Sequence, residues 1–76
     1  MDKSKSVEAV ATTLSVIEYL ASSPAPSRLK DIADHLDIPG SKVHRHLCTL
    51  RAHGYLEQED ETGRYYLTAK LIYLGQ

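Results

Sequence analysis

Residues 29–54, LKDIADHLDIPGSKVHRHLCTLRAHG, decide the fold of this chain. Two apolar patterns flank a short break: Leu29, Ile32, Ala33 and Leu36 precede it, and Val43, Leu47 and Leu50 follow it. Residues three, four and seven positions apart share one face of an α-helix, so each pattern predicts a helix with one buried side. Residues 37–40, DIPG, predict a tight turn in which Ile38 packs between the two helices. Gly54 predicts the end of the second helix. The stretch therefore predicts a helix, a turn and a helix.

The second helix, expected over about residues 41–53, keeps polar side chains on the face that its apolar residues leave free. They are Ser41, Lys42, His44, Arg45, Cys48 and Thr49. In a helix-turn-helix this helix enters the DNA major groove, where arginine pairs with guanine and the helix N-terminus favours phosphate. We therefore expect Arg45 at a base, and Ser41 and Lys42 at phosphates. His44 is expected at a base or a phosphate, and Thr49 and Arg51 nearer the flanking backbone.

Two short segments rich in tyrosine and leucine, residues 55–58 and 64–67, follow this helix. The polar residues 59–63 between them end in glycine and suit a hairpin loop. Alternate strand residues face opposite sides, so Tyr65 and Leu67 are expected to face the core and Tyr66 to point outward. A hairpin in this place is the wing of a winged helix, expected over about residues 55–67. Arg64 and Tyr66 are predicted to reach the flanking backbone or the minor groove. The acidic residues 59–61 should keep the tip away from phosphate.

The ends of the chain complete the expected architecture. Val7, Val10, Leu14, Ile17 and Leu20 recur at helical spacing and predict a first helix with this face against a core, ended by the prolines that follow. Residues 1–6 are expected to be a flexible tail, 7–68 the winged helix-turn-helix, and 69–76 the start of a linker helix to a missing C-terminal effector domain. The predicted fold is mainly α with a small β-hairpin, a three-helix core plus a wing.

Composition limits the classes of function. A chain of 76 residues with 42% hydrophobic content makes one small domain. It has no apolar run near the roughly 20 residues that cross a bilayer and no signal peptide, so we expect a cytoplasmic protein without a membrane partner. A single cysteine fits a reducing compartment. The net charge is −1, but residues 28–54 contain five Lys or Arg against three Asp, together with all four histidines. Positive charge is therefore local to the predicted DNA-binding segment.

Two other interpretations stay open. His44 and Cys48 lie one helical turn apart, so they could ligate a metal with His46 or His53, or act as a nucleophile pair. A small chain offers little room to exclude water from a catalytic site, and we expect no enzymatic activity, no cofactor and no metal. Alternatively, the outer face of the second helix could dock another protein. Docking surfaces carry aromatic, Leu or Met anchors at their centre, whereas this face is polar.

Taken together, these segments resemble the N-terminal winged helix-turn-helix domain of IclR-type bacterial transcription regulators. The resemblance covers about residues 10–75 and rests on residues 29–33, 36–45, 54–57 and 63–67 with Leu47 and Leu50. It implies a dimeric repressor or activator on a palindromic operator, with a small-molecule effector bound by the missing C-terminal domain. Ser41, Lys42, His44 and Arg45 match the family's recognition-helix positions, and Arg64 matches its wing. Thr12 and Thr13 stand where the family usually has arginine and then alanine.

Overall fold

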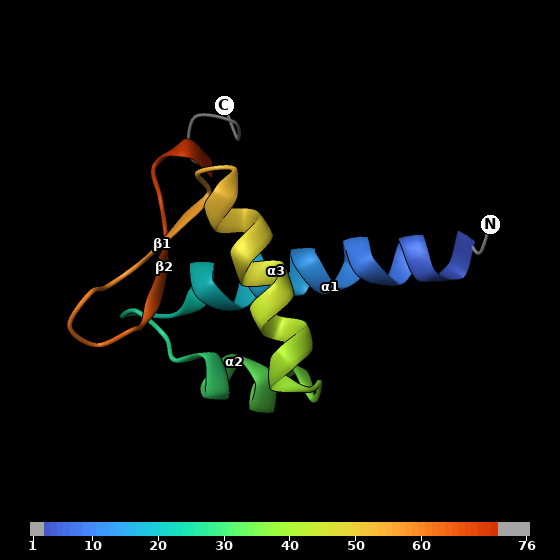
Figure 1. Cartoon of the computed structure of the whole chain (residues 1–76), viewed down its shortest axis with the longest axis horizontal. Helices are drawn as coiled ribbons and strands as arrows, with labels where there is room; N and C mark the ends of the chain where they lie inside the picture. The colour runs from blue at the N-terminus through green and yellow to red at the C-terminus, as the bar shows by residue number, and fades with distance from the viewer. Residues whose placement is uncertain (1–2, 72–76) are drawn as a thin grey trace.

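The computed structural model describes residues 3–71, with side chains described from Val7 onward. Three helices, α1 (Lys3–Ser22), α2 (Leu29–Leu36) and α3 (Gly40–Ala52), precede an antiparallel hairpin of β1 (Leu56–Gln58) and β2 (Tyr65–Leu67). α3 crosses α1, α2 packs against both, and the hairpin lies at the C-terminal end of α1 (Figure 1). The predicted winged helix-turn-helix is confirmed.

The core lies where the three helices meet the hairpin. Its fully buried side chains come from every helix and from β1: Val16, Ile32, Val43, Leu47 and Leu56. On α3, Val43, Leu47 and Leu50 are all buried, which confirms the predicted inner face of that helix. Because these three residues share one side, the opposite side of α3 faces solvent.

The turn between α2 and α3 sets the angle of α3. Asp37 adopts the left-handed conformation, with φ of 55°, and ends α2. The Ile38 N–H then donates to the Ala33 carbonyl at 3.2 Å, and the Ile38 side chain packs against the core as predicted. The Pro39 carbonyl accepts the first hydrogen bonds of α3, which begins at Gly40, one residue before the expected Ser41. At the other end Gly54, with φ of +82°, follows the last turn in the conformation that glycine adopts without strain.

Ser27 anchors the hairpin to the helices. It exchanges two backbone hydrogen bonds with Tyr65, at 2.9 Å and 2.8 Å, and so acts as a one-residue third strand. Within the hairpin, Leu56 pairs with Leu67 and Gln58 with Tyr65. Tyr65 is buried, Leu67 is half-buried and Tyr66 is exposed, as the alternation predicted. Most of the linker helix expected over residues 69–76 lies outside the described residues.

The structure corrects the prediction for α1. The helix begins at Lys3, four residues before the expected start at Val7. Val7, Val10 and Leu14 were expected in the core, yet they are 67%, 60% and 52% exposed. A helix of 20 residues is about 30 Å long, and its N-terminal end extends beyond the other elements (Figure 1). The apolar periodicity identified the right kind of element but not the side that packs: α1 turns Val16 and Leu20 toward the core, whereas Val7, Val10 and Leu14 lie on the opposite side.

Candidate nucleic-acid interface

The solvent face of α3 is the candidate interface. At about 100° per residue, Ser41, Arg45 and Cys48 lie opposite the buried Val43 and Leu47. All three of these outer residues are exposed. Lys42 and Thr49 border this face on the side of α1, and His44 and Arg51 border it on the side of the hairpin. The helix therefore presents a polar surface about three turns long.

Four of the predicted contact residues form one continuous patch on α3, namely Ser41, Lys42, Arg45 and Thr49. Among the described side chains, no carboxylate lies within ion-pair distance of Lys42 or Arg45. Their charges are therefore free to meet an external anion. The Thr49 hydroxyl donates to the Arg45 carbonyl at 3.1 Å, so its oxygen lone pairs are left to accept a hydrogen bond.

Arg51 has a different environment from the other cations of α3. Its Nη1 donates to Gln58 Oε1 at 3.1 Å, and its Nε lies 3.9 Å from a carboxylate oxygen of Glu57. Both partners belong to β1. Arg51 therefore braces α3 against the hairpin, a contact that the sequence did not signal because the partners follow a turn. Its predicted contact with the DNA backbone stays a prediction.

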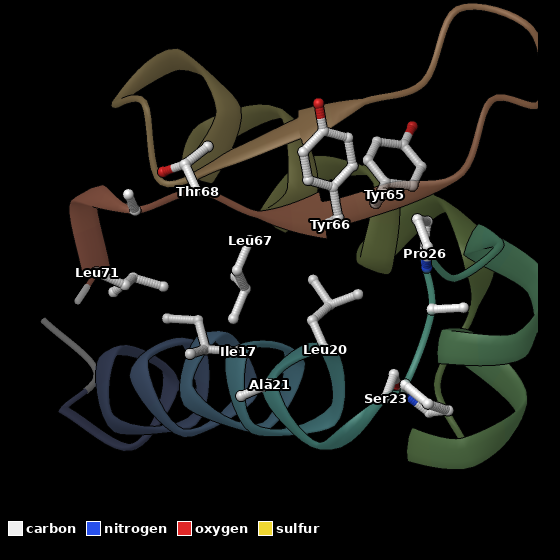
Figure 2. A pocket seen from close by; sticks show the side chains of 13 residues that line it. Ile17, Leu20, Ala21, Ser23, Pro26, Tyr65, Tyr66, Leu67, Thr68 and Leu71 are labelled. Atoms are coloured by element: carbon white, nitrogen blue, oxygen red, sulfur yellow. The ribbon is translucent and has the colours of Figure 1, made fainter.

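The two residues predicted on the wing lie apart from the α3 patch. Arg64 is half-buried directly before β2, and its carbonyl accepts the Glu59 N–H at 2.7 Å, which closes the hairpin loop. Tyr66 lies on β2 at the edge of an apolar groove of about 820 Å³ between the hairpin and α1. Figure 2 shows Leu67 pointing across this groove toward Ile17 and Leu20. The groove is apolar and does not form part of the polar face of α3.

His44 and Cys48 meet as their spacing suggested. The Cys48 Sγ lies 3.6 Å from Nε2 and 3.7 Å from Nδ1 of His44, and both side chains are exposed. Within the described residues, no cluster of three or more His, Cys, Asp or Glu side chains could hold a metal ion. The pair is a local contact on the surface of α3.

One polar contact between α1 and α3 was missed by the sequence analysis. Thr13 Oγ1 lies 2.8 Å from His46 Nδ1. Burial first, and the positive charges of Lys42 and Arg45 second, lower the pKa of His46 below its ordinary value of 6.5. Thr13 and His46 belong to different helices, and no local pattern pairs them. His46 is therefore a mainly neutral group at the edge of a positively charged face.

The family comparison agrees with this geometry. The model of the IclR helix-turn-helix domain matches residues 9–60, a range that contains α2, the turn, α3 and β1. The chain belongs to this family. It is therefore a DNA-binding domain of the kind found in IclR transcription regulators, and α3 is the second helix of its helix-turn-helix.

Relatives of known role match nearly the whole chain. The chain is 32% identical over 71 residues to a glycerol operon regulatory protein of Streptomyces coelicolor, covering 93% of this chain and 28% of that protein. It is 28% identical over 69 residues to the transcriptional repressor IclR of Escherichia coli, a match that covers 91% of this chain and 25% of that protein. The crystal structure of an IclR family regulator from Brucella abortus superposes with a TM-score of 0.85 at 28% identity, covering 99% of this chain and 28% of that one.

This IclR helix-turn-helix domain spans about a quarter of the length of the regulators it matches. The similarity therefore concerns the DNA-binding part of those proteins. Among the helices that the structure describes, none has the length and apolar character needed to span a bilayer.

Proposed function

We propose that this IclR helix-turn-helix domain reads a specific sequence of duplex DNA with the outer face of α3 in the major groove. One observation carries the proposal: the burial of Val43, Leu47 and Leu50 turns Lys42 and Arg45 outward without an acidic partner among the described residues. Arg45 pairs with a guanine edge, a contact worth about 1–3 kcal/mol of discrimination between bases. Ser41 and Lys42, in the first turn of α3, hold backbone phosphates, which the helix N-terminus also favours.

The remaining predicted contacts border this centre. His44 contacts a base or a phosphate beside Arg45, and Thr49 and Arg51 contact the flanking backbone, Arg51 while it braces β1. Arg64 and Tyr66 bring the hairpin to the flanking backbone or the minor groove. The acidic tip of the hairpin stays away from the phosphates because like charges repel.

Salt dependence and base selection test this proposal. Duplexes selected from a random pool by a dimerised form of the chain should share one motif. The logarithm of their affinity should fall linearly with the logarithm of salt concentration, because neutralised phosphates release counterions. Lys42→Ala should reduce that slope by about one unit, whereas Lys30→Ala, an exposed lysine on α2, serves as the control. A flat salt response, or unchanged affinity in Lys42→Ala and Arg45→Ala, would instead favour a protein-docking role for this face.

We also propose that a second copy of the chain covers the exposed apolar residues of α1, Val7, Val10 and Leu14. They lie on the side of α1 that is turned away from its buried residues, Val16 and Leu20. A two-fold dimer would present two copies of α3 to the half-sites of a palindromic operator, about 10 base pairs apart. Exposed apolar residues at helical spacing are suited to such a self-complementary contact.

Sedimentation measurements test the dimer. Val10→Glu places a charge inside the proposed contact and should convert a dimer into a monomer. Lys30→Gln changes the net charge by the same single unit on another helix and should leave the dimer intact. A monomeric wild-type chain, or a dimer that survives Val10→Glu, would contradict the proposal.

The full protein is proposed to be a bacterial repressor or activator that works in the cytoplasm. Its small-molecule effector would bind a further domain, reached through a linker helix that begins within residues 69–76. The length of the curated relatives supports this, since the chain corresponds to about a quarter of each. DNA binding of this type needs no catalytic residue, cofactor or metal, and none is proposed.

A further inference from the structure

A small hollow lies between α1 and α3 at the edge of the proposed recognition face. It has a volume of about 190 Å³ and is lined by Ala9 of α1 and by Lys42, Arg45, His46 and Thr49 of α3. Three nitrogen-bearing side chains converge on it, and no carboxylate lines it. Ala9 closes the α1 side with only a methyl group, which leaves space for a ligand beside the three nitrogen-bearing groups.

Hydrogen bonding fixes the orientation of the His46 ring. The hydroxyl of Thr13 has one proton, which it donates to the Ala9 carbonyl at 2.9 Å. Its oxygen must therefore accept from His46 Nδ1, 2.8 Å away. Nδ1 thus carries the proton in the neutral ring, and Nε2 is the atom that gains a proton when the ring becomes charged.

The surroundings of His46 disfavour that charge until an anion arrives. Burial and the neighbouring Lys42 and Arg45 lower the pKa of its imidazole. From α1 the ring meets Ala9 and Thr13, neither of which ionises. An anion in the hollow would reverse this balance, because it attracts the imidazolium and offsets the repulsion from the two cations.

We propose that this hollow, beside Arg45, binds one phosphate of the DNA backbone, held by Lys42 and the Nε2–H of protonated His46, with Thr13 as the positioning residue. The proposal rests on the proposed function, since it needs α3 in the major groove. Phosphate contacts set the register of a protein on the duplex, so α1 takes part in that register through Thr13. The Nε2 proton comes from solvent, and each domain that binds DNA takes up one proton.

The test is the pH dependence of binding to a short duplex of mixed sequence at constant salt. Wild-type affinity should rise as pH falls from about 8 to 5.5, by no more than the tenfold per pH unit that uptake of one proton allows. His46→Gln cannot be protonated at this position, so it should lose the part of the increase in affinity that comes from uptake of this proton. Thr13→Val should weaken the rise while affinity at pH 8 stays near wild type. His35→Gln, on α2, is the matched control and should keep the wild-type profile.

A second measurement needs no variant. NMR titration of the His46 ring should give a pKa below 6.5 in the free chain and a higher one in the complex. A His46 pKa that DNA leaves unchanged, or a His46→Gln variant that is folded and keeps the full pH response, would overturn the inference. In either case salt-dependent binding at pH 8 would leave the proposed function standing. Absence of duplex binding at every pH would overturn both.

Discussion

α1 and α3 carry similar apolar patterns but lie in different surroundings. On α3, each residue of the pattern Val43, Leu47 and Leu50 is buried. On α1, the pattern is buried only toward its C-terminal end, at Leu20, while Val10 and Leu14 are exposed by 60% and 52%. A helical apolar pattern therefore marks the core-facing side of α3 but, over Val7, Val10 and Leu14, the solvent-exposed side of α1.

The difference shows what helical periodicity measures. It identifies which residues share a face, and it carries no information on whether another element covers that face. α2, α1 and β1 cover the apolar side of α3, whereas α1 turns Val16 and Leu20 toward its neighbours and extends past them at its N-terminal end (Figure 1). The solvent-exposed sides of the two helices differ as well. That of α3 is polar, whereas that of α1 carries the apolar Val7, Val10 and Leu14.

Truncating one leucine on each helix should give the largest difference between α1 and α3, measured as the loss in free energy of unfolding. Leu47→Ala removes a fully buried side chain and should lower the free energy of unfolding by about 2–5 kcal/mol. Leu14→Ala, on the exposed side of α1, should change it by about 0.5 kcal/mol or less. Urea unfolding at a concentration where the chain is monomeric measures both. Equal losses would mean that the side of α1 that carries Leu14 is packed within a single chain.

Removing one exposed charge from α3 should weaken DNA binding, whereas removing one from α1 should not. Arg45→Ala should weaken binding to the selected motif by about 1–3 kcal/mol and relax the preference at a single base pair. Glu18→Ala, on the exposed side of α1, should not weaken it, because no contact with DNA is proposed there. Competition binding with single-base variants of the motif measures both effects. A larger loss in Glu18→Ala would place the DNA on α1.

The smallest effect is expected on the pH dependence of stability, at His46, where α1 and α3 meet. Its pKa is lowered in the folded chain, so the unfolded chain binds more protons once the pH falls below about 6.5. The contribution of His46 to stability is therefore complete above pH 6.5 and is lost as the pH falls. The urea midpoint of wild type should drop more between about pH 7.5 and 5.5 than that of His46→Gln. An equal drop in both proteins would show that His46 does not titrate differently on folding.

Contacts within one element, or across a short turn, could be predicted from the sequence. The inner face of α3, the packing of Ile38 and the alternation of Tyr65 and Tyr66 follow from fixed helical and strand periods. Pairs from distant segments could not, because no period relates them. Thr13 with His46 is such a pair, and so is Ser27 with Tyr65. The exposure of Val10 also escaped prediction, since the apolar spacing does not show against which side of α1 the other elements pack.

The way the chain leaves the hairpin has a mechanical consequence. The Thr68 hydroxyl donates to the Gly54 carbonyl at 2.6 Å, its N–H donates to the Tyr55 carbonyl at 3.0 Å, and Lys70 Nζ donates to the His53 carbonyl at 2.7 Å. All three acceptors belong to the segment that directly follows α3. A pull or rotation applied to the polypeptide after Leu71 would load this junction first. The residues that leave the hairpin are therefore tied by hydrogen bonds to the C-terminal end of α3.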